Sequence, residues 1–320
     1  RMDPAKVDEV FSQVVFSGDD FKATFDKQSG LLTSYIYKKQ EYIHNGQGPQ
    51  PFFWRAPTDN DYGAKLPTRL KAWREASYQT PKAESFNVSK DGDKSIVKVT
   101  YRFPQVDAQW EITYKVFANG IIKVDNRFVA EGTETPMIPR VGLRMQLSEI
   151  LNDLTYYGRG PEENYRDRRT SQFIGEYTTP IKDLYEPYIR PQENEHRTDI
   201  YWCALTTKQK AGLLFIADRT FELNASNYLL GSLDSGETID NGAPRTNETN
   251  HRHLTDPQPV KQVDMFIDYR MMGVGGDNSW GAIAHEPYLI RPGVENAIEY
   301  GFSIVPFDKK ADYKNLIYQY

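Results

Sequence analysis

The sequence predicts an all-β protein built as a large antiparallel sandwich. Three observations lead to this fold class. Apolar and polar residues alternate with a period of two in most regular segments, an Asn-Gly turn joins two of these segments, and only one short segment has helical spacing. Strands and helices do not alternate regularly along the chain, which argues against a (β/α)₈ barrel and a doubly wound sheet.

The clearest strands are predicted at residues 96–103 and 110–117, where every second residue is apolar. In "IVKVTYRF" the residues that share the apolar face are Val97, Val99, Tyr101 and Phe103. In "WEITYKVF" the corresponding residues are Trp110, Ile112, Tyr114 and Val116. We expect both apolar faces to lie in the core, because a strand directs successive side chains to opposite sides of its sheet.

A turn at Ala118-Asn119-Gly120 follows the second of these strands, and "IIKVDNRFV" returns as a strand. Asn-Gly is a typical hairpin sequence, because both residues tolerate positive φ angles. Residues 263–271 and 297–305 alternate in the same way, so two further half-buried strands are predicted there.

One helix is predicted at residues 66–76, where Leu70 and Trp73 lie three positions apart. Residues 1–15 are expected to lead in from a preceding domain, because the sequence starts without a Met at position 1. Residues 16–320 are predicted to form one large β domain, since a chain of this length can bury its own core.

Composition narrows the class of function. Apolar residues make up 39% of the chain and charged residues 26%, with both signs interspersed and a net charge of −5. This balance argues against nucleic acid and anionic membranes as main partners. No apolar run approaches the roughly 20 residues that a membrane span requires. Cys203 is the single cysteine, which excludes an internal disulfide and a multi-cysteine metal site.

The segment "GVGGDNSWG" (residues 273–281) first suggests a phosphate-binding loop. The dinucleotide fingerprint requires a third glycine where Asn278 stands, and the two prolines of "HEPYLIRP" prevent the helix that should follow. The Gly-Lys-Ser/Thr of a Walker motif is also missing from this stretch. Two interpretations remain: a loop at a strand end, or a loop that presents Trp280 as a binding surface.

Three other segments combine prolines or glycines with carboxylates, Arg and Asn: residues 51–63, 156–170 and 187–199. We call them polar loops 1, 2 and 3. One such segment alone would be an ordinary solvated turn. Three of them predict convergent loops at one end of a sheet, where ligand sites usually form.

Catalytic and metal sites are less clearly indicated. Asp59-Asn60-Asp61 resembles the start of a calcium loop, but Tyr62-Gly63 breaks the required order. His251 and His253 share a face in a strand, yet no third ligand has recognisable spacing. A glycosidase pair requires two carboxyls about 5 Å apart in retaining enzymes, which spacing cannot test. The carboxylates available for such a pair are Glu162, Glu163 and Glu193.

Four motifs carry a family resemblance: "FFWRAPTDNDYG", "YYGRGPEENYRDR", "YIRPQENEHR" and "MMGVGGDNSWG". In this order they resemble the C-terminal domain of the large β-galactosidases of glycoside hydrolase family 2, and the resemblance spans roughly residues 14–306. It implies a β-supersandwich similar to the galactose mutarotase fold. Family members often have Gly where Glu195 stands, so the turn there is expected to differ.

The resemblance also implies a division of labour. The acid/base and nucleophilic glutamates of the family lie in an upstream (β/α)₈ barrel, so no catalytic residue is expected in this segment. Magnesium and sodium are expected in the missing upstream domains, and no cofactor or metal in this one. The substrate-binding residues that the resemblance assigns are Gly63, at the start of a mobile loop, and Trp280, as an apolar platform for a sugar. We expect Gly63 to act as a hinge in a conformation that a Cβ would disfavour.

The expected partners are the upstream domains of the same polypeptide and a β-galactoside, with no nucleic acid or membrane and with a homo-oligomer as an open possibility. Trp280 could instead pack only at an interdomain contact. A free-standing aldose mutarotase is the main rival, and its acid would come from His44, His196 or His253. A non-catalytic carbohydrate-binding module is a third reading. The compartment stays open between bacterial cytoplasm and periplasm.

Overall fold

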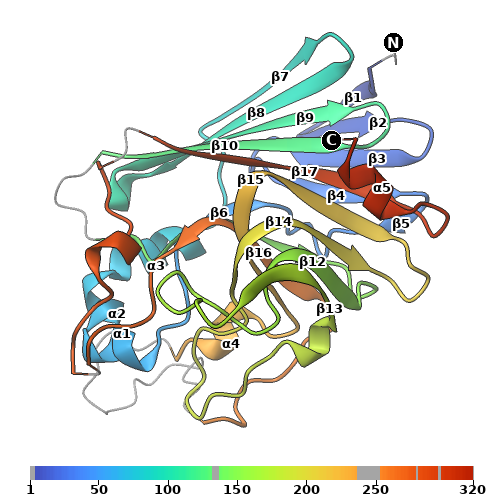
Figure 1. Ribbon diagram of the computed structural model, residues 1–320. Coiled ribbons are helices and arrows are strands. Elements are labelled where there is room, and N and C mark those ends of the chain that lie inside the picture. Colours follow the sequence, from blue (N-terminus) through green and yellow to red (C-terminus); the bar gives the residue numbers. More distant parts are fainter. Residues whose placement is uncertain (1–3, 132–136, 236–252, 279, 295–296, 320) are drawn as a thin grey trace.

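The computed structural model describes residues 4–131, 137–235, 253–278, 280–294 and 297–319, and these form two antiparallel sheets, with most of the short helices at one end of the molecule (Figure 1). The predicted fold class, an all-β antiparallel supersandwich, is confirmed. No helix in the described part of the chain is long and apolar enough to cross a membrane.

The smaller sheet has five strands that pair in chain order. They are β1 (Lys6–Val10), β2 (Gln13–Ser17), β3 (Phe21–Asp26), β4 (Leu32–Tyr37) and β5 (Gln40–Glu41). Residues 6–10 thus pair with the strand that follows them, inside the stretch expected to be a lead-in. The boundary between residues 15 and 16 stays a prediction.

The larger sheet has twelve strands, nine of them in the order β13-β12-β14-β15-β17-β10-β9-β8-β7. Beside this path, β11 pairs with β6 and β16, and β16 also pairs with β15. The strands are β6 (Gln50–Phe52), β7 (Ser85–Asp91), β8 (Lys94–Phe103), β9 (Ala108–Phe117), β10 (Ile122–Ala130), β11 (Arg140–Leu147), β12 (Asp153–Gly160), β13 (Phe173–Pro180), β14 (Arg197–Thr206), β15 (Gly212–Ser226), β16 (Val263–Met271) and β17 (Ile298–Phe307).

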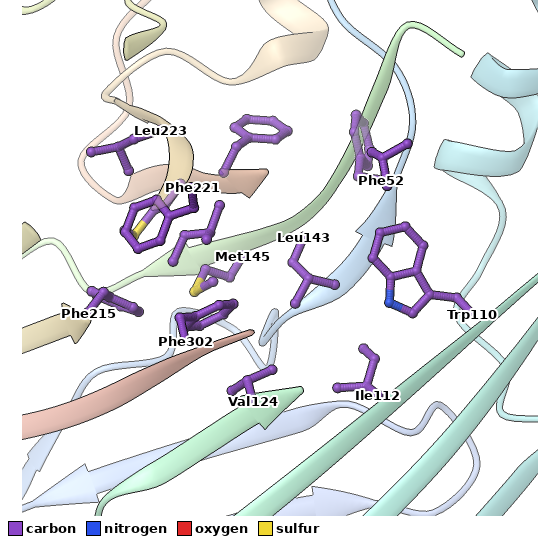
Figure 2. Close-up of a cluster of buried hydrophobic side chains, with 14 of the residues drawn as sticks. Phe52, Trp110, Ile112, Val124, Leu143, Met145, Phe215, Phe221, Leu223 and Phe302 are labelled. Atoms are coloured by element: carbon purple, nitrogen blue, oxygen red, sulfur yellow. The ribbon is translucent and has the colours of Figure 1, made fainter. Parts of the chain in front are cut away.

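The hairpin and the two clearest strands are confirmed. The predicted turn joins β9 to β10, and the apolar faces read from residues 97–103 and 110–116 are buried. Phe25 of the smaller sheet meets Tyr114 of β9 with ring centroids 5.0 Å apart, so these faces form the contact between the sheets. Figure 2 shows this core, where Trp110 and Ile112 point toward Leu143.

The burial predicted for residues 263–271 is wrong, although the strand exists. In β16 the first six residues are all buried, so both of its faces lie inside the protein. The polar residues of its pattern face arginines of β11. Arg144 Nε lies 2.8 Å from Asp264 Oδ1, and Arg140 Nε lies 3.0 Å from Asp268 Oδ2. Because each carboxylate has a cationic neighbour, alternation here does not indicate a face in water.

Polar loop 1 ends in the short helix α1 (Asp59–Gly63), and two more short helices follow it: α2 (Leu66–Arg69) and α3 (Lys71–Tyr78). The predicted helix is therefore present but interrupted at Leu70, which departs from helical geometry at φ −109°. Trp73 and Leu70 are buried as their spacing predicted. The remaining short elements are η1 (Pro104–Val106), η2 (Ile181–Asp183), α4 (Leu230–Leu233), η3 (Glu286–Tyr288) and α5 (Tyr313–Ile317).

Candidate functional site

The three polar loops converge, as the sequence predicted, and they do so beside the glycine-rich segment. Together they line a cleft of about 210 Å³, which we call the polar cleft. Its lining comes from polar loop 1 (Thr58, Asp59, Asn60), polar loop 2 (Tyr165, Arg168), polar loop 3 (Tyr188, Gln192, Glu193) and Val274. Sequence segments that lie far apart thus form one site at one end of the larger sheet.

Side-chain contacts hold polar loop 3 against the other two. Gln192 Nε2 donates to Asp59 Oδ2 at 3.1 Å, and the Arg190 guanidinium lies 3.6 Å from the Tyr62 ring centroid. The backbone N–H of Glu195 donates to Glu163 Oε2 at 2.9 Å. The contacts to polar loop 1 span more than a hundred residues in sequence and the contact to polar loop 2 spans 32, so the cleft is fixed by tertiary contacts.

The carboxylate of Glu163, in polar loop 2, accepts several hydrogen bonds. It accepts hydrogen bonds from Arg168 Nη2, at 2.6 Å, and from the Tyr188 hydroxyl as well as from the Glu195 backbone. The neighbouring Glu162 is exposed. A carboxylate with three donors, one of them a guanidinium, has its negative charge already compensated. Glu163 therefore serves to position the loops.

The side chain of Asp167 anchors the glycine-rich segment through its backbone. Its Oδ1 accepts from the Val274 N–H at 3.1 Å, and its Oδ2 accepts from the Gly275 N–H at 2.8 Å. A Cβ at Gly273 would come within 2.7 Å of the Asp167 carboxyl, so a glycine is required there by close approach. The glycine at position 273 therefore makes room for an anchoring carboxylate.

A second anchor is the buried ion pair of Arg55 and Asp61. Asp61 also closes a capping box at the start of α1, where Thr58 Oγ1 accepts from the Asp61 N–H and the Asp61 carboxylate accepts from the Thr58 N–H. Arg55 donates to the carbonyls of Met272 and Gly273 at 2.5 Å and 3.1 Å. The same guanidinium therefore fixes both α1 and the glycine-rich segment.

The Trp280 side chain is 90% exposed in the glycine-rich segment, and the backbone N–H of Trp280 donates to Asn278 Oδ1 at 2.9 Å. The next residue, Gly281, has a φ of +129°, and a Cβ there would lie 3.2 Å from the carbonyl oxygen of Gly63. The structure thus brings the two residues assigned to substrate binding next to each other. Neither lines the polar cleft itself.

The conformation expected of Gly63 is wrong. Gly63 is the last residue of α1 and is not among the glycines with positive φ. The capping box starts a regular helical turn at Asp59 that still includes Gly63, so an alanine could adopt the same backbone angles. Its role as the start of a mobile loop remains a prediction.

A buried polar network lies beneath the cleft. Asn224 Nδ2 donates to Glu193 Oε1 at 2.9 Å, and Asn224 Oδ1 accepts from Arg140 Nη2 at 2.9 Å. His196 Nδ1 contacts the same Asn224 oxygen at 2.7 Å, while its Nε2 contacts Glu222 Oε2 at 2.9 Å. Every member is buried, and Glu193 also lines the cleft, so the network stabilises the base of the site.

The contacts of His196 favour its charged form. Both ring nitrogens face oxygen acceptors, and an imidazole can donate from both only when it is protonated. Burial alone would lower the pKa of His196, but the hydrogen bond and charge of Glu222 outweigh burial and raise it. Burial raises the pKa of Glu222 in turn, and the His196 and Arg166 charges more than offset this, so that the pKa is lowered. The Tyr165 ring stacks on His196 with centroids 5.3 Å apart.

Glu195 occupies the turn for which a departure was expected. Its φ is +68°, a left-handed conformation that suits glycine, and its side chain is buried. Its carboxyl accepts from Ser226 Oγ at 3.2 Å. Burial raises the pKa of Glu195 well above its ordinary value, and this outweighs the opposing effects of Ser226 and Arg197.

Sequence reasoning missed the strand residues of this network, namely Arg140, Glu222, Asn224 and Asp268. Each was hidden in a pattern where a polar residue normally indicates a solvent-facing position. One available signal was the density of charge in β11 and β16, where arginines and aspartates occur within strongly apolar runs. Burial further raises the pKa of Asp268 to about 7.

The other candidates take ordinary roles or lie outside the described residues. Asp61 faces Arg55 and not a cation site, and Glu193 is occupied by Asn224 and Arg140. In the part of the chain that the structure describes, no group of three His, Cys, Asp or Glu side chains could hold a metal ion. His251 is not among the described residues, so its pairing with His253 is not described here.

Comparison with known proteins bears on this arrangement. The family model described as "Beta galactosidase small chain" matches residues 17–304, which include all four motifs. The chain belongs to this family. The β-galactosidase of Priestia megaterium is 33% identical over 89% of this chain and 26% of its own length, and that of Halalkalibacterium halodurans is 30% identical over 90% and 27%.

The small-chain family membership confirms the resemblance read from the motifs. The chain spans about a quarter of the length of these curated relatives. Among solved structures, it is similar to the galactose 1-epimerase of Lactobacillus acidophilus, with a TM-score of 0.47 and 6% identity over 92% of this chain and 94% of that one.

His196 is unsuitable as the acid of a mutarotase, because both of its ring nitrogens are engaged and the side chain is buried.

Proposed function

We propose that this chain is the C-terminal domain of a β-galactosidase that hydrolyses terminal β-D-galactosides with retention. It completes the sugar pocket with Trp280 and the loop after α1, and the catalytic glutamates come from upstream domains. The observation that carries the proposal is the small-chain family match over residues 17–304, in a chain about a quarter as long as its β-galactosidase relatives.

The hydrogen bonds of the carboxylates in the polar cleft favour a structural role for these groups over a catalytic one. Retaining glycosidases need one carboxyl free to attack and another free to transfer a proton. Glu163 is held by three donors, and Glu193 is buried against Asn224 and Arg140. Both carboxylates are already committed to positioning neighbouring groups. We infer that the chain alone has no hydrolytic activity.

The exposure of Trp280 supports its use as a platform for a ligand. A large indole ring that is 90% exposed loses its hydrophobic contacts unless another molecule or domain covers it. The C–H face of a pyranose fits such a flat ring while its hydroxyls bond elsewhere. Arg55 and Asp167 anchor the segment that carries Trp280, so the ring is offered from a preorganised loop.

Upstream domains of the same polypeptide are the partners that this proposal requires, with a β-galactoside as the ligand. Magnesium and sodium would bind in those upstream domains. An alternative role for Trp280, packing against an upstream domain without touching sugar, predicts a different response to mutation.

The test is an assay of the full-length polypeptide that contains this chain. It should hydrolyse nitrophenyl β-D-galactoside, and NMR of the first-formed sugar should show the β anomer. Nitrophenyl β-D-glucoside serves as the control substrate and should be hydrolysed much more slowly. Absence of β-galactosidase activity, or release of the α anomer, would refute the proposed function.

A further inference from the structure

A second and larger cavity, which we call the strand groove, has a volume of about 810 Å³. Arg166 lines it, whereas the neighbouring residues Tyr165 and Arg168 line the polar cleft. The segment of polar loop 2 therefore separates the two cavities. A volume of this size lies within the range of sites for small ligands.

The strand groove exists because β15 changes partners. Its first half pairs with β17 through Gly212–Ala217, and its second half pairs with β16 through Glu222–Ser226. Asp218, Arg219 and Thr220 lie between these pairings, are exposed and line the groove. Residues of β9, β10 and β17 also line the groove. A split in the sheet thus leaves a lined opening between two sets of paired strands.

Four carboxylates line the strand groove, and each has a cation beside it. Glu111 lies 2.9 Å from Lys98, Asp125 lies 2.7 Å from Lys115, Glu299 lies 3.6 Å from Arg127, and Asp218 pairs with Lys123. Such pairs keep spare lone pairs for hydrogen bonds while cancelling the local charge. The lining is therefore rich in acceptors and carries no strong negative field.

Donors and aromatic faces complete the lining. Arg219 of β15 and Arg270 of β16 both line the groove; Arg219 is exposed, and the buried Nε of Arg270 makes no hydrogen bond to any residue that the structure describes. Tyr269 and Tyr300 both line the groove, with ring centroids 6.2 Å apart. The Arg270 guanidinium lies 5.2 Å from the Tyr269 ring centroid, within the range of a cation–π contact.

We propose that the strand groove binds a neutral oligosaccharide at a site separate from the polar cleft. Sugar hydroxyls donate and accept hydrogen bonds, so they match a wall in which paired carboxylates accept and guanidiniums donate. Tyrosine rings suit the apolar faces of pyranose rings. A charged ligand would have to compete with the existing ion pairs, whereas a neutral one leaves them intact.

The test is a titration of this chain with uncharged tetrasaccharides (β-galactotetraose, cellotetraose and maltotetraose) followed by NMR. At least one of them should bind to the unmodified chain. The substitutions Arg219→Ala and Arg270→Ala should each weaken its affinity about tenfold, which is the loss expected for one hydrogen bond to a charged group. Arg102→Ala is the matched control, because Arg102 is an exposed strand arginine outside the groove.

The NMR shift changes separate this site from the proposed sugar platform: on titration of the wild-type chain they should include Arg219 and the residues beside it on β15, and the Arg219→Ala variant should lose them. Arg219 is exposed, so its variant reports on the groove even if Arg270→Ala disturbs folding. The inference is overturned if none of the three tetrasaccharides binds, if binding is unaffected by both groove variants, or if trigalacturonic acid or a glucosamine trimer binds more tightly than every neutral sugar.

Discussion

The Arg55 guanidinium grips the Asp61 carboxylate in a two-point contact, with Nε 3.0 Å from Oδ2 and Nη2 2.8 Å from Oδ1. Both side chains are buried, and the same guanidinium donates to two carbonyls of the glycine-rich segment. Figure 1 shows α1 beside that segment, at the end of the molecule away from β7. The contact therefore ties the helix that ends at Gly63 to the loop that carries Trp280.

Removing Arg55 should be strongly destabilising. Arg55→Leu leaves the Asp61 charge buried without its partner, which typically costs about 3–5 kcal/mol in the free energy of unfolding. The double variant Arg55→Leu/Asp61→Leu should recover part of this loss, because it removes both charges. Urea unfolding of the two variants measures the difference. Equal stability of the single and double variants would show that the ion pair is not what holds this region.

Trp280→Leu should affect substrate binding in the full-length enzyme and leave the fold alone. Loss of the aromatic face should raise KM roughly five- to thirty-fold, equivalent to about 1–2 kcal/mol, with a much smaller change in kcat. The melting temperature should not change, because the ring is 90% exposed. Tyr318→Leu is the matched control, since Tyr318 is an equally exposed aromatic residue on α5's C-terminal side.

The interdomain reading of Trp280 makes the opposite prediction. If the ring only packs against an upstream domain, Trp280→Leu lowers the melting temperature of the full-length enzyme and leaves KM unchanged. That pair of results would exclude the platform role. Steady-state kinetics and calorimetry on the same preparations separate the two readings.

The strands β8 and β9 could be predicted from sequence, because one face of each is buried and the other is more accessible to solvent. Alternation fails in β16, whose aspartates are buried against Arg140 and Arg144. No periodicity distinguishes a carboxylate in water from one that faces an arginine on a strand distant in sequence. The pairing of strands that are distant in sequence decides whether the carboxylate is buried, and a local sequence pattern does not contain this information.

Only part of the candidate site could be predicted, because the contacts of its buried residues are also long-range. Polar loops are dense in charge and stand out locally, so their convergence could be expected. Glu222 and Asn224 lie on β15 and were missed, whereas His196 lies in polar loop 3 and was considered only as a mutarotase candidate. The φ of Gly63 was predicted wrongly, because the capping box of Thr58 and Asp61 extends a helical turn to it.

Stability should fall as the pH rises from about 5 to about 8. The pKa of Asp268 is raised from 3.8 to about 7, so the folded state holds an extra proton between these values and loses stability as the pH increases. The raised pKa of His196 acts in the same direction: its contribution is complete below 6.5 and is lost as the pH passes its folded pKa. The lowered pKa of Glu222 makes stability fall again only on the acid side of 4.5.

Urea unfolding across this pH range measures the effect. His196→Gln should flatten the decline above about pH 6.5, because the group that releases its proton there is removed. His44→Gln is the control and should leave the slope unchanged, since His44 lies outside the network. Stability that rises steadily toward about pH 8 would contradict the charge assignment.

Glycine should be favoured over alanine at position 195. Both substitutions remove the buried carboxyl, but only glycine adopts a φ of +68° without strain, so Glu195→Gly should be about 1 kcal/mol more stable than Glu195→Ala. The order should reverse at Glu75, in the middle of α3, where alanine is the better helix former by about 1 kcal/mol. The same order at both positions would show that the turn at Glu195 imposes no backbone constraint.

The central claim is that this chain completes a β-galactosidase pocket without supplying its chemistry. Mixing the separately purified chain with the upstream remainder of the polypeptide, and following nitrophenyl β-D-galactoside hydrolysis, tests it most directly. We predict that the chain alone shows no turnover, that the remainder alone is severely impaired, and that activity appears on mixing. Turnover that follows the purified chain through successive columns, or a remainder that is fully active by itself, would contradict the claim.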